Sequence, residues 1–345
     1  MAVRPGEALD AGPLGDYLSR QLPRLSLPIS VSQFPAGFSN LTYLLSSGES
    51  EFVLRRPPFG TRPRSGHDMG REFRVLSALA PRFAECPRPL HYCADESVIG
   101  APFYLVERIR GIILRRDYPA GLTPTPALVR AQQFALVDTL ARLHRIDWRD
   151  CGLADFGRPE RYAERQVEGW AGRYARALTA DAAPAAPVTN WLAANLPPDP
   201  PLVALIHNDF KLDNVVFDAT RPERLIGVLD WEMATVGDSA MDLGCALAYW
   251  VEPGDDAKLL ETRMLPTQLP GALSRAEVLA RYAVQSGRSF PDFRFYRVFG
   301  LFRLAVIVQQ IYRRFERGET SDPRFATLGD MARVLVARAE LEIHG

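Results

Sequence analysis

Residues 207–214 read HNDFKLDN, and residues 228–232, a short distance further along the chain, read VLDWE. The first stretch places two aspartates, two asparagines and a lysine together between two apolar runs. The second places Asp230 at the end of an apolar run that is typical of a β-strand. Asn and Asp are also good turn residues, so the octapeptide alone is compatible with a plain turn between two strands. The remainder of the chain decides between these alternatives.

The spacing H-x-D-x-x-x-x-N is that of the protein-kinase catalytic loop, and it is satisfied here by Asp209 and Asn214. Phosphoryl transfer needs a carboxylate that orients the attacking hydroxyl and takes its proton, together with an amide oxygen and a second carboxylate that hold Mg²⁺. We therefore predict Asp209 as the catalytic base, and Asn214 and Asp230 as ligands of Mg²⁺. Lys211 is placed to neutralise charge on the transferred phosphoryl group.

Bulk composition excludes several other classes of protein. The 345 residues contain 41 basic and 41 acidic side chains, so the net charge gives no general attraction to nucleic acid or to an anionic membrane. The four cysteines have no C-x-x-C spacing, and no apolar run approaches the ~20 residues of a membrane helix. We expect a cytoplasmic protein that binds neither nucleic acid nor membranes.

Local patterns indicate two lobes. Short β-rich runs fill residues 30–56 and 102–109, and a helix capped by Asp68 lies between them. Long helical patterns then dominate, at 126–144, at 158–178 and over most of 271–341. We predict an N-terminal nucleotide-binding lobe over residues 1–108 and a C-terminal catalytic and acceptor-binding lobe over residues 109–345.

Taken together, the motifs resemble those of one known superfamily. HNDFKLDN, VLDWE, GDSAMDLG at 237–244 and LARLHRID at 140–147 are similar to the motifs of aminoglycoside phosphotransferases and choline kinases. The resemblance is closest to the kinase-like domain that some acyl-CoA dehydrogenases carry as a fusion. It implies an α+β, protein-kinase-like bilobal fold, with a small antiparallel β-rich N-lobe, a larger mostly helical C-lobe and ATP between them. It also implies that Asp242 is a structural carboxylate bonded to the catalytic-loop backbone.

The strand FVLRR carries the expected phosphate-binding cation. Side chains alternate along a strand, so Val53 and Arg55 share a face, which matches the position where kinases have a small residue followed by Lys. Glu72, on the following helix, is the candidate brace for Arg55. An arginine can bind phosphate bidentately but is not equivalent to lysine. The alternative is a surface arginine on an edge strand.

Two further segments are assigned to the nucleotide. In GFSNLTY, Ser39 and Asn40 offer donors to phosphate, although an ordinary turn would have the same composition. The hinge that holds adenine through backbone groups is predicted near Glu107 and Ile109, at the end of the strand 102–109.

These assignments predict an ATP- and Mg²⁺-dependent kinase that acts on a hydroxyl of a small metabolite. The alternative is a catalytically silent nucleotide- or partner-binding module of the same fold. Cationic acceptors are suggested by acidic residues at Glu232, Glu252, Asp255 and Asp256, whereas the acyl-CoA dehydrogenase resemblance suggests a hydroxyacyl compound or its CoA ester. The stripe that includes Tyr162, Trp170 and Tyr174 on one helix favours core packing, with an acceptor pocket as the alternative. Oligomeric state is left open.

Overall fold

The computed structural model describes residues 3–34, 40–59, 68–198, 203–320 and 322–344, so the predicted phosphate-loop residue Ser39 lies outside the described residues. The chain divides into two compact units. The first comprises Met1–Gly111, Cys151–Leu153 and Ile226–Ala234, and the second comprises Ile112–Asp150, Ala154–Leu225 and Thr235–Gly345. The segment Ile226–Ala234 is remote in sequence from the rest of the first unit, yet it gives that unit Asp230.

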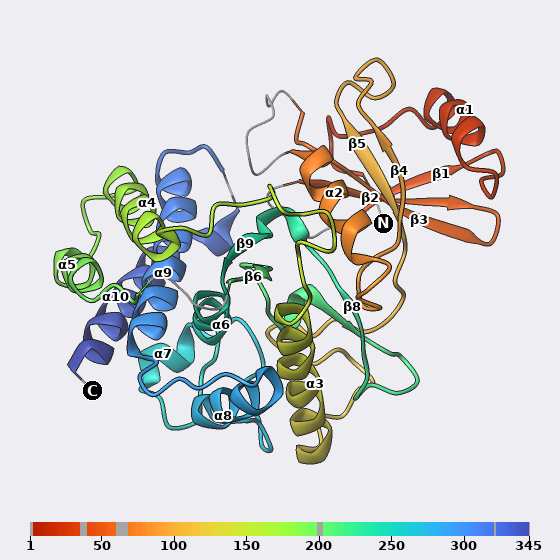
Figure 1. Cartoon of the computed structure of the whole chain (residues 1–345). Helices are drawn as coiled ribbons and strands as arrows, with labels where there is room; N and C mark the ends of the chain where they lie inside the picture. Colours follow the sequence, from red (N-terminus) through yellow and green to blue (C-terminus); the bar gives the residue numbers. More distant parts are fainter. Residues whose placement is uncertain (1–2, 35–39, 60–67, 199–202, 321, 345) are drawn as a thin grey trace. The chain divides into compact units, whose positions relative to one another are not determined.

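The first unit is built on a five-stranded antiparallel sheet (Figure 1). Its strands lie in the order β1 (Ser30–Gln33), β2 (Leu41–Ser47), β3 (Ser50–Arg56), β5 (Phe103–Glu107) and β4 (Pro89–Cys93). One face packs against helix α1 (Ala11–Gln21), which begins after its N-cap Asp10. Leu14 and Leu18 of α1 share a core cluster with Leu54 and Phe103. Burial of this apolar face stabilises the sheet.

Helix α2 (Met69–Leu79) packs against β4 and β5 and begins after the predicted cap, Asp68, whose side chain accepts a hydrogen bond from the Arg71 backbone N–H. Alternation along β3 turns Leu54 toward the α1 core and Arg55 to the opposite face. The antiparallel register places Arg55 opposite Tyr104 of β5. Arg55 and Glu72 of α2 are therefore brought together on one face of the sheet.

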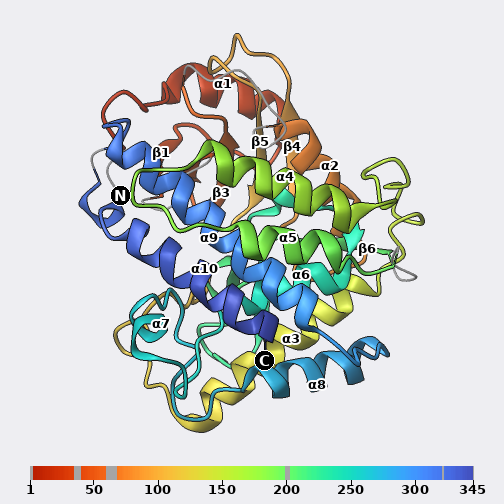
Figure 2. The same ribbon diagram turned by 90° about the vertical axis from the view of Figure 1, so that its left-hand side faces the viewer.

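The second unit is mostly helical, as Figures 1 and 2 show. Its helices are α3 (Pro126–His144), α4 (Tyr162–Arg176), α5 (Ala186–Ala194), α6 (Ser239–Leu247), α7 (Ala257–Glu261), α8 (Arg275–Ser286), α9 (Arg294–Glu316) and α10 (Leu328–His344). Helices α9 and α10 run side by side, and α4 and α5 pack beside α9 (Figure 2). No helix among the described residues is both long and apolar enough to cross a membrane.

Short strands and single turns carry the polar motifs. Strand β6 (Val203–Ile206) pairs antiparallel with β9 (Thr235–Asp238). Strand β6 ends directly before His207, and β9 ends where α6 begins. Strand β7 (Val215–Phe217) follows the polar loop, and β8 (Leu225–Val228) crosses from the second unit into the first and leads to Asp230. The turns between them are η2 (Leu212–Asn214), η3 (Trp231–Met233) and, nearer the C-terminus, η4 (Pro323–Phe325).

Helices α6 and α9 approach each other at two glycines. A Cβ added to Gly300 would overlap the carbonyl group of Gly244, and a Cβ added to Gly244 would overlap the carbonyl group of Tyr296. The contact is therefore main chain against main chain, which only glycine permits. It fixes the spacing of the helix that carries Asp242 and the helix that carries Arg303.

Candidate active site

The loop after β6 is held by a buried carboxylate of the second unit. Oδ2 of Asp242 accepts the backbone N–H of His207 and Oδ1 accepts that of Asn208, each at 2.8 Å. Asn208 adopts a left-handed conformation with φ of 65°, so the chain turns sharply just before Asp209. The interaction predicted for Asp242 from the resemblance is present, and it defines the direction of the peptide that precedes Asp209.

Two further buried groups hold Asp242. His144 Nε2 lies 3.1 Å from Asp242 Oδ2, and His144 Nδ1 lies 2.7 Å from the hydroxyl of Tyr282. Burial lowers the pKa of His144, so the ring is neutral, with Nε2–H donating to Asp242. Burial alone would raise the pKa of Asp242, but the hydrogen bonds that it accepts from His144 and from the His207 backbone help to lower it below its usual value. Asp242 therefore remains an ionised acceptor for the loop.

Arg303 on α9 holds the same turn through its carbonyl group. Its Nη2 donates to Asn208 O at 2.6 Å, and its guanidinium carbon lies 5.1 Å from the centre of the Trp170 ring. The residue is only 3% exposed. Asp242 and Arg303 thus bind the N–H and C=O groups around Asn208, and we call this pair the loop clamp. Arg303 was not predicted from the sequence, although its charge inside the apolar run GLFRLAV of α9 could have indicated a functional residue.

The loop brings Asp209, Lys211 and Asn214 together. The amide nitrogen of Asn214 donates to Asp209 Oδ2 and to Asp209 O, both at 2.8 Å. Lys211 Nζ lies 3.2 Å from Asp209 Oδ2 and 3.7 Å from Asp213 Oδ1. The hydroxyl of Tyr249 lies 3.4 Å from Asp209 Oδ1, a long contact. Oδ1 is therefore the atom of Asp209 best placed to receive a proton, and the Asn214 amide oxygen is the atom turned away from Asp209.

Charge interactions keep Asp209 ionised. Burial raises its pKa, but the positive charges of Lys211 and Arg303 oppose burial, and the pKa lies below its usual value. Burial would lower the pKa of Lys211, yet the neighbouring Tyr249, Asp209 and Asp213 raise it well above the usual range. The pair is an ionised carboxylate beside a protonated amine, which suits a group that orients a hydroxyl.

The first unit gathers three carboxyl groups around Arg55. Nη1 donates to Glu72 Oε1 at 2.9 Å and to Asp230 Oδ1 at 3.1 Å, and Nη2 donates to the same Asp230 oxygen and to Glu232 Oε2, both at 3.1 Å. The structure thus brings together the predicted residues Arg55, Glu72 and Asp230. Glu232, which the sequence analysis placed only in a possible acceptor wall, belongs to the same cluster.

Burial and charge define the ionisation of this cluster. Burial would lower the pKa of Arg55, but Glu72, Asp230 and Glu232 raise it well above the usual range, so the guanidinium is charged. Burial raises the pKa of Glu72, and the charge of Arg55 only partly opposes that rise. Nε of Arg55 is buried and has no hydrogen-bond partner within the described part of the chain. The partners of the guanidinium are therefore bound through its terminal nitrogens.

The other predicted nucleotide residues that the structure describes lie at the ends of the interior strands β2 and β5. Asn40 is buried beside the start of β2, and its amide donates to Glu232 Oε2 at 2.7 Å. Glu107 ends β5, where its backbone N–H donates to Arg88 O at 2.9 Å, and Ile109 follows two residues later. The assignment of Glu107 and Ile109 to an adenine hinge stays a prediction.

Known proteins resemble this chain in sequence and in fold. A family model of the phosphotransferase enzyme family matches residues 30–296. The chain belongs to this family. As a phosphotransferase family member it resembles acyl-CoA dehydrogenase family member 11 of Gallus gallus, with 35% identity over 337 residues, which are 93% of this chain and 43% of the relative. The chain thus spans less than half the length of that curated relative.

Two solved structures resemble this phosphotransferase. A protein of Ralstonia eutropha JMP134, whose assignment as an aminoglycoside phosphotransferase is itself provisional, has 30% identity and a TM-score of 0.82 over 98% of this chain and 99% of that one. Choline kinase of Cryptosporidium parvum Iowa II has 11% identity and a TM-score of 0.65 over 97% of this chain and 96% of that one, which is a likeness of fold alone.

These findings confirm three of the predictions. The chain resembles the superfamily named from its motifs, including the part that acyl-CoA dehydrogenase proteins carry. The α+β, protein-kinase-like architecture is confirmed. The reaction class of the family, transfer of a phosphoryl group to an alcohol-type acceptor, is the class predicted from Asp209 and Asn214.

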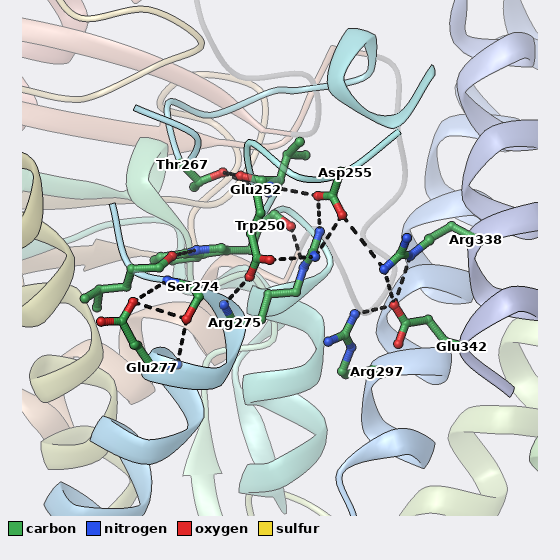
Figure 3. A network of polar contacts seen from close by, with 12 residues as sticks. Trp250, Glu252, Asp255, Thr267, Ser274, Arg275, Glu277, Arg297, Arg338 and Glu342 are labelled. Carbon is green, nitrogen blue, oxygen red and sulfur yellow. Dashed lines mark hydrogen bonds and ion pairs between the residues drawn. The ribbon is translucent and has the colours of Figure 1, made fainter. Parts of the chain in front are cut away.

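The acidic residues suggested as walls for a cationic acceptor are engaged elsewhere in this phosphotransferase (Figure 3). Asp255, with a side chain only 4% exposed, is ion-paired with Arg275 and also lies 3.8 Å from Arg338. Glu252 lies 3.4 Å from Arg275. The Asp256 side chain caps α7. The charges of Glu252 and Asp255 are thus balanced by arginines, as that of Glu232 is by Arg55.

Proposed function

We propose that this chain transfers the γ-phosphoryl group of ATP, with Mg²⁺, to a hydroxyl group of a small metabolite. The observation that carries the proposal is the ionised Asp209, fixed by the loop clamp with its Oδ1 largely free, beside Asn214. In the reaction, the bond between the γ-phosphorus and the β,γ-bridging oxygen breaks while a bond to the acceptor oxygen forms. Asp209 Oδ1 orients the acceptor hydroxyl and receives its proton.

The residues present fit a magnesium nucleotide. Mg²⁺ in phosphoryl-transfer enzymes is held by few protein oxygens together with phosphates and water. In keeping with this, no group of three or more His, Cys, Asp or Glu within the described ranges is arranged to hold a metal alone. Within the described residues, the hydrogen bonds of Asp230, whose side chain is 37% exposed, use Oδ1, and those of the Asn214 side chain use its amide nitrogen, which leaves one oxygen of each residue for a metal. Mg²⁺ held by such oxygens would neutralise charge on the phosphates.

The cation on β3 supports ATP binding by the first unit. Arg55 is charged and braced by Glu72, and a guanidinium suits phosphate oxygens. Asn40 adds a side chain at the neighbouring strand β2. Lys211 is paired with Asp209 and Asp213 in the second unit, where its positive charge can offset charge on the transferred group.

The acceptor is proposed to be a hydroxyacyl compound or its CoA ester. The relatives supply the first reason, because this chain matches a segment of proteins named for acyl-CoA dehydrogenases. Electrostatics supply the second. The Trp170 ring lies 4.3 Å from the guanidinium carbon of Arg173 as well as near Arg303, and the pKa of Arg173 is lowered by burial and then by Arg303 and Arg176. An anionic acceptor would relieve this repulsion between cations.

A silent nucleotide- or partner-binding module remains the second candidate. It is favoured by the arginine at the lysine position, whose terminal N–H groups are engaged by carboxylates of the chain itself. Asp209 and Asn214 argue against it, because a silent module has no need of an ionised carboxylate beside an amide.

Thermal denaturation with ATP, GTP or no nucleotide, with and without Mg²⁺, tests nucleotide binding. A ligand that binds only the folded chain at a hundredfold excess over Kd adds about 2.7 kcal/mol to the free energy of unfolding. We expect an Mg²⁺-dependent shift that Asp230→Ala weakens. ADP release is then measured with hydroxyacyl compounds, their CoA esters and cationic alcohols.

Substitution of the base separates the two candidates. Asp209→Asn should lower kcat by orders of magnitude, on the scale of about 10²–10⁴ for loss of a general base, while the nucleotide shift persists. Asp218→Asn is the matched control, because Asp218 lies in an exposed turn after the same loop. Nucleotide binding without ADP release from any acceptor would favour the silent module, and unchanged turnover in Asp209→Asn would refute the assigned base.

A further inference from the structure

The donors of Arg55 are almost fully engaged by carboxylates of its own unit. A guanidinium has five N–H groups, of which four are on the terminal nitrogens. Within the described residues, four hydrogen bonds from Nη1 and Nη2 go to Glu72, to Asp230 twice and to Glu232. Three carboxyl groups thus surround one cation. A phosphate can bind the terminal nitrogens only if a carboxylate gives way.

The two terminal nitrogens have different roles. Nη1 is committed to Glu72, which is 2% exposed at its side chain and comes from the neighbouring helix α2. Nη2 donates instead to Asp230 and Glu232, both from the segment after β8. Nη2 is therefore the nitrogen that remains for a phosphate once these two carboxylates are drawn away.

Glu232 accepts hydrogen bonds from Asn40 as well as from Nη2 of Arg55. Its Oε2 accepts the amide N–H of Asn40 at 2.7 Å as well as the Arg55 donor at 3.1 Å, and its side chain is 15% exposed. The carboxylate is thus fixed by two donors from different strands, β2 and β3. A fixed carboxylate at this position repels a polyanion and competes with it for the same N–H group.

We propose that Glu232 makes phosphate binding by Arg55 conditional on a divalent cation, so that the chain selects the magnesium nucleotide over the free nucleotide. This inference rests on the proposed function. Asp230 and Glu232 are hard oxygen ligands on the same short segment, with the Asp230 side chain partly exposed, so a divalent cation attracts both. When their charge is neutralised, Nη2 can donate to phosphate. Glu232 thereby couples two binding events that would otherwise be separate.

The test is nucleotide affinity measured by titration calorimetry for ADP and ATP, once with EDTA and once with Mg²⁺. The quantity compared is the ratio of the Kd in EDTA to the Kd in Mg²⁺. In Glu232→Gln, which keeps the shape but removes the charge, we expect tighter binding in EDTA and a ratio reduced by about tenfold, as expected for loss of a coupling of ordinary size. Glu232→Ala, which removes the competing acceptor as well, should reduce the ratio at least as much.

Glu49→Gln is the matched control. Glu49 is exposed in the turn between β2 and β3, so the same charge is removed from the same unit at the far end of the strands. We expect its ratio to equal that of the wild type. A ratio unchanged in both Glu232 variants, or one reduced equally by Glu49→Gln, would overturn the inference while magnesium-dependent binding by the wild type upheld the proposed function. Failure of the wild type to bind nucleotide under any condition would overturn both.

Discussion

Replacing Arg303 by methionine should separate the position of the catalytic loop from the binding of nucleotide. The substitution deletes the hydrogen bond from Nη2 to Asn208 O and the contact with the Trp170 ring. A hydrogen bond from a charged donor contributes about 1.5–3 kcal/mol, and a partly desolvated guanidinium–aromatic contact about 0.5–2 kcal/mol. Methionine recovers some packing, so the expected loss of unfolding free energy is about 3 kcal/mol.

The effect on catalysis should exceed the effect on stability. A loss of about 3 kcal/mol in a chain of this length lowers Tm by only about 4 °C, because the unfolding entropy is about 2.1 cal/mol/K per residue. The chain therefore stays folded at 25 °C, but the turn at Asn208, with its left-handed φ of 65°, loses one side of the loop clamp. A displacement of Asp209 by about 1 Å should lower kcat about 100-fold.

The assay is ADP release with a saturating acceptor, together with calorimetric Kd for the magnesium nucleotide and a melting curve. The Kd should change much less than kcat, because Arg55 and Asp230, which are proposed to contact the nucleotide, belong to the first unit, whereas the loop contributes only the proposed metal ligand Asn214. Arg314→Met, at an exposed position on the same helix α9, is the control and should leave all three readouts unchanged. A folded Arg303→Met protein with wild-type kcat would refute the reasoning, and so would an equal loss in Arg314→Met.

Three further predictions concern stability. Because the pKa of His144 is lowered by folding, the unfolded chain binds a proton below pH 6.5 that the folded chain does not bind. The free energy of unfolding should therefore fall as the pH drops from 6.5 toward the folded pKa. The fall amounts to about 1.4 kcal/mol for each unit by which the folded and unfolded pKa values differ. Chemical denaturation of His144→Gln should show a shallower slope in that window, and equal slopes would contradict the assignment. Asp255→Asn leaves Arg275 without its nearly buried partner and should cost about 3–5 kcal/mol. Asp256→Asn keeps a good helix cap and should cost little. Identical denaturation midpoints for these two variants would contradict the structural role of the Asp255–Arg275 ion pair shown in Figure 3. Gly300→Ala should destabilise by about 1–3 kcal/mol through overlap with α6, whereas Gly169→Ala, which faces open space on α4, should stabilise by up to about 1 kcal/mol. Shifts of the same sign in denaturant midpoint would contradict that prediction.

Local signals were sufficient for the elements that carry the chemistry. Asp68 caps α2, the pattern at 126–144 is α3 with the same bounds, and alternation along β3 turned Arg55 and Leu54 to opposite faces as expected. These features depend on neighbours in sequence, where capping, helical period and strand period act.

Other elements depend on distant partners and were missed. Helix α1 and strand β4 gain their stability from one shared sheet and core, and helix α5 begins inside the Ala/Pro-rich stretch at 181–188. The long pattern at 271–341 is divided into α8, α9 and α10, and the stretch assigned to 158–178 is helical only over Tyr162–Arg176. Tertiary contacts decided these boundaries.

The same distinction applies to the candidate site. The motif spacing identified Asp209, Asn214, Asp230 and Asp242 because each lies in a short polar signature. Arg303 and Glu232 act through contacts that join residues far apart in sequence, with Asn208 and with Arg55 respectively. Spacing along one sequence does not predict such pairs, because it does not show which residues of α9 lie against the loop after β6.

The glycine crossing of α6 and α9 bears on how such a chain can diversify. With Gly244 and Gly300 in main-chain contact, the supports of Asp242 and Arg303 behave as one joint, and a single added methyl group would displace both at once. Arg173 lies on α4, outside that joint, whereas Trp170 of the same helix contacts Arg303. With the acceptor beside α4, as proposed, selection at Arg173 would alter substrate range while the position of the proposed catalytic carboxylate is inherited unchanged, so substrate range and catalytic power could evolve along separate paths.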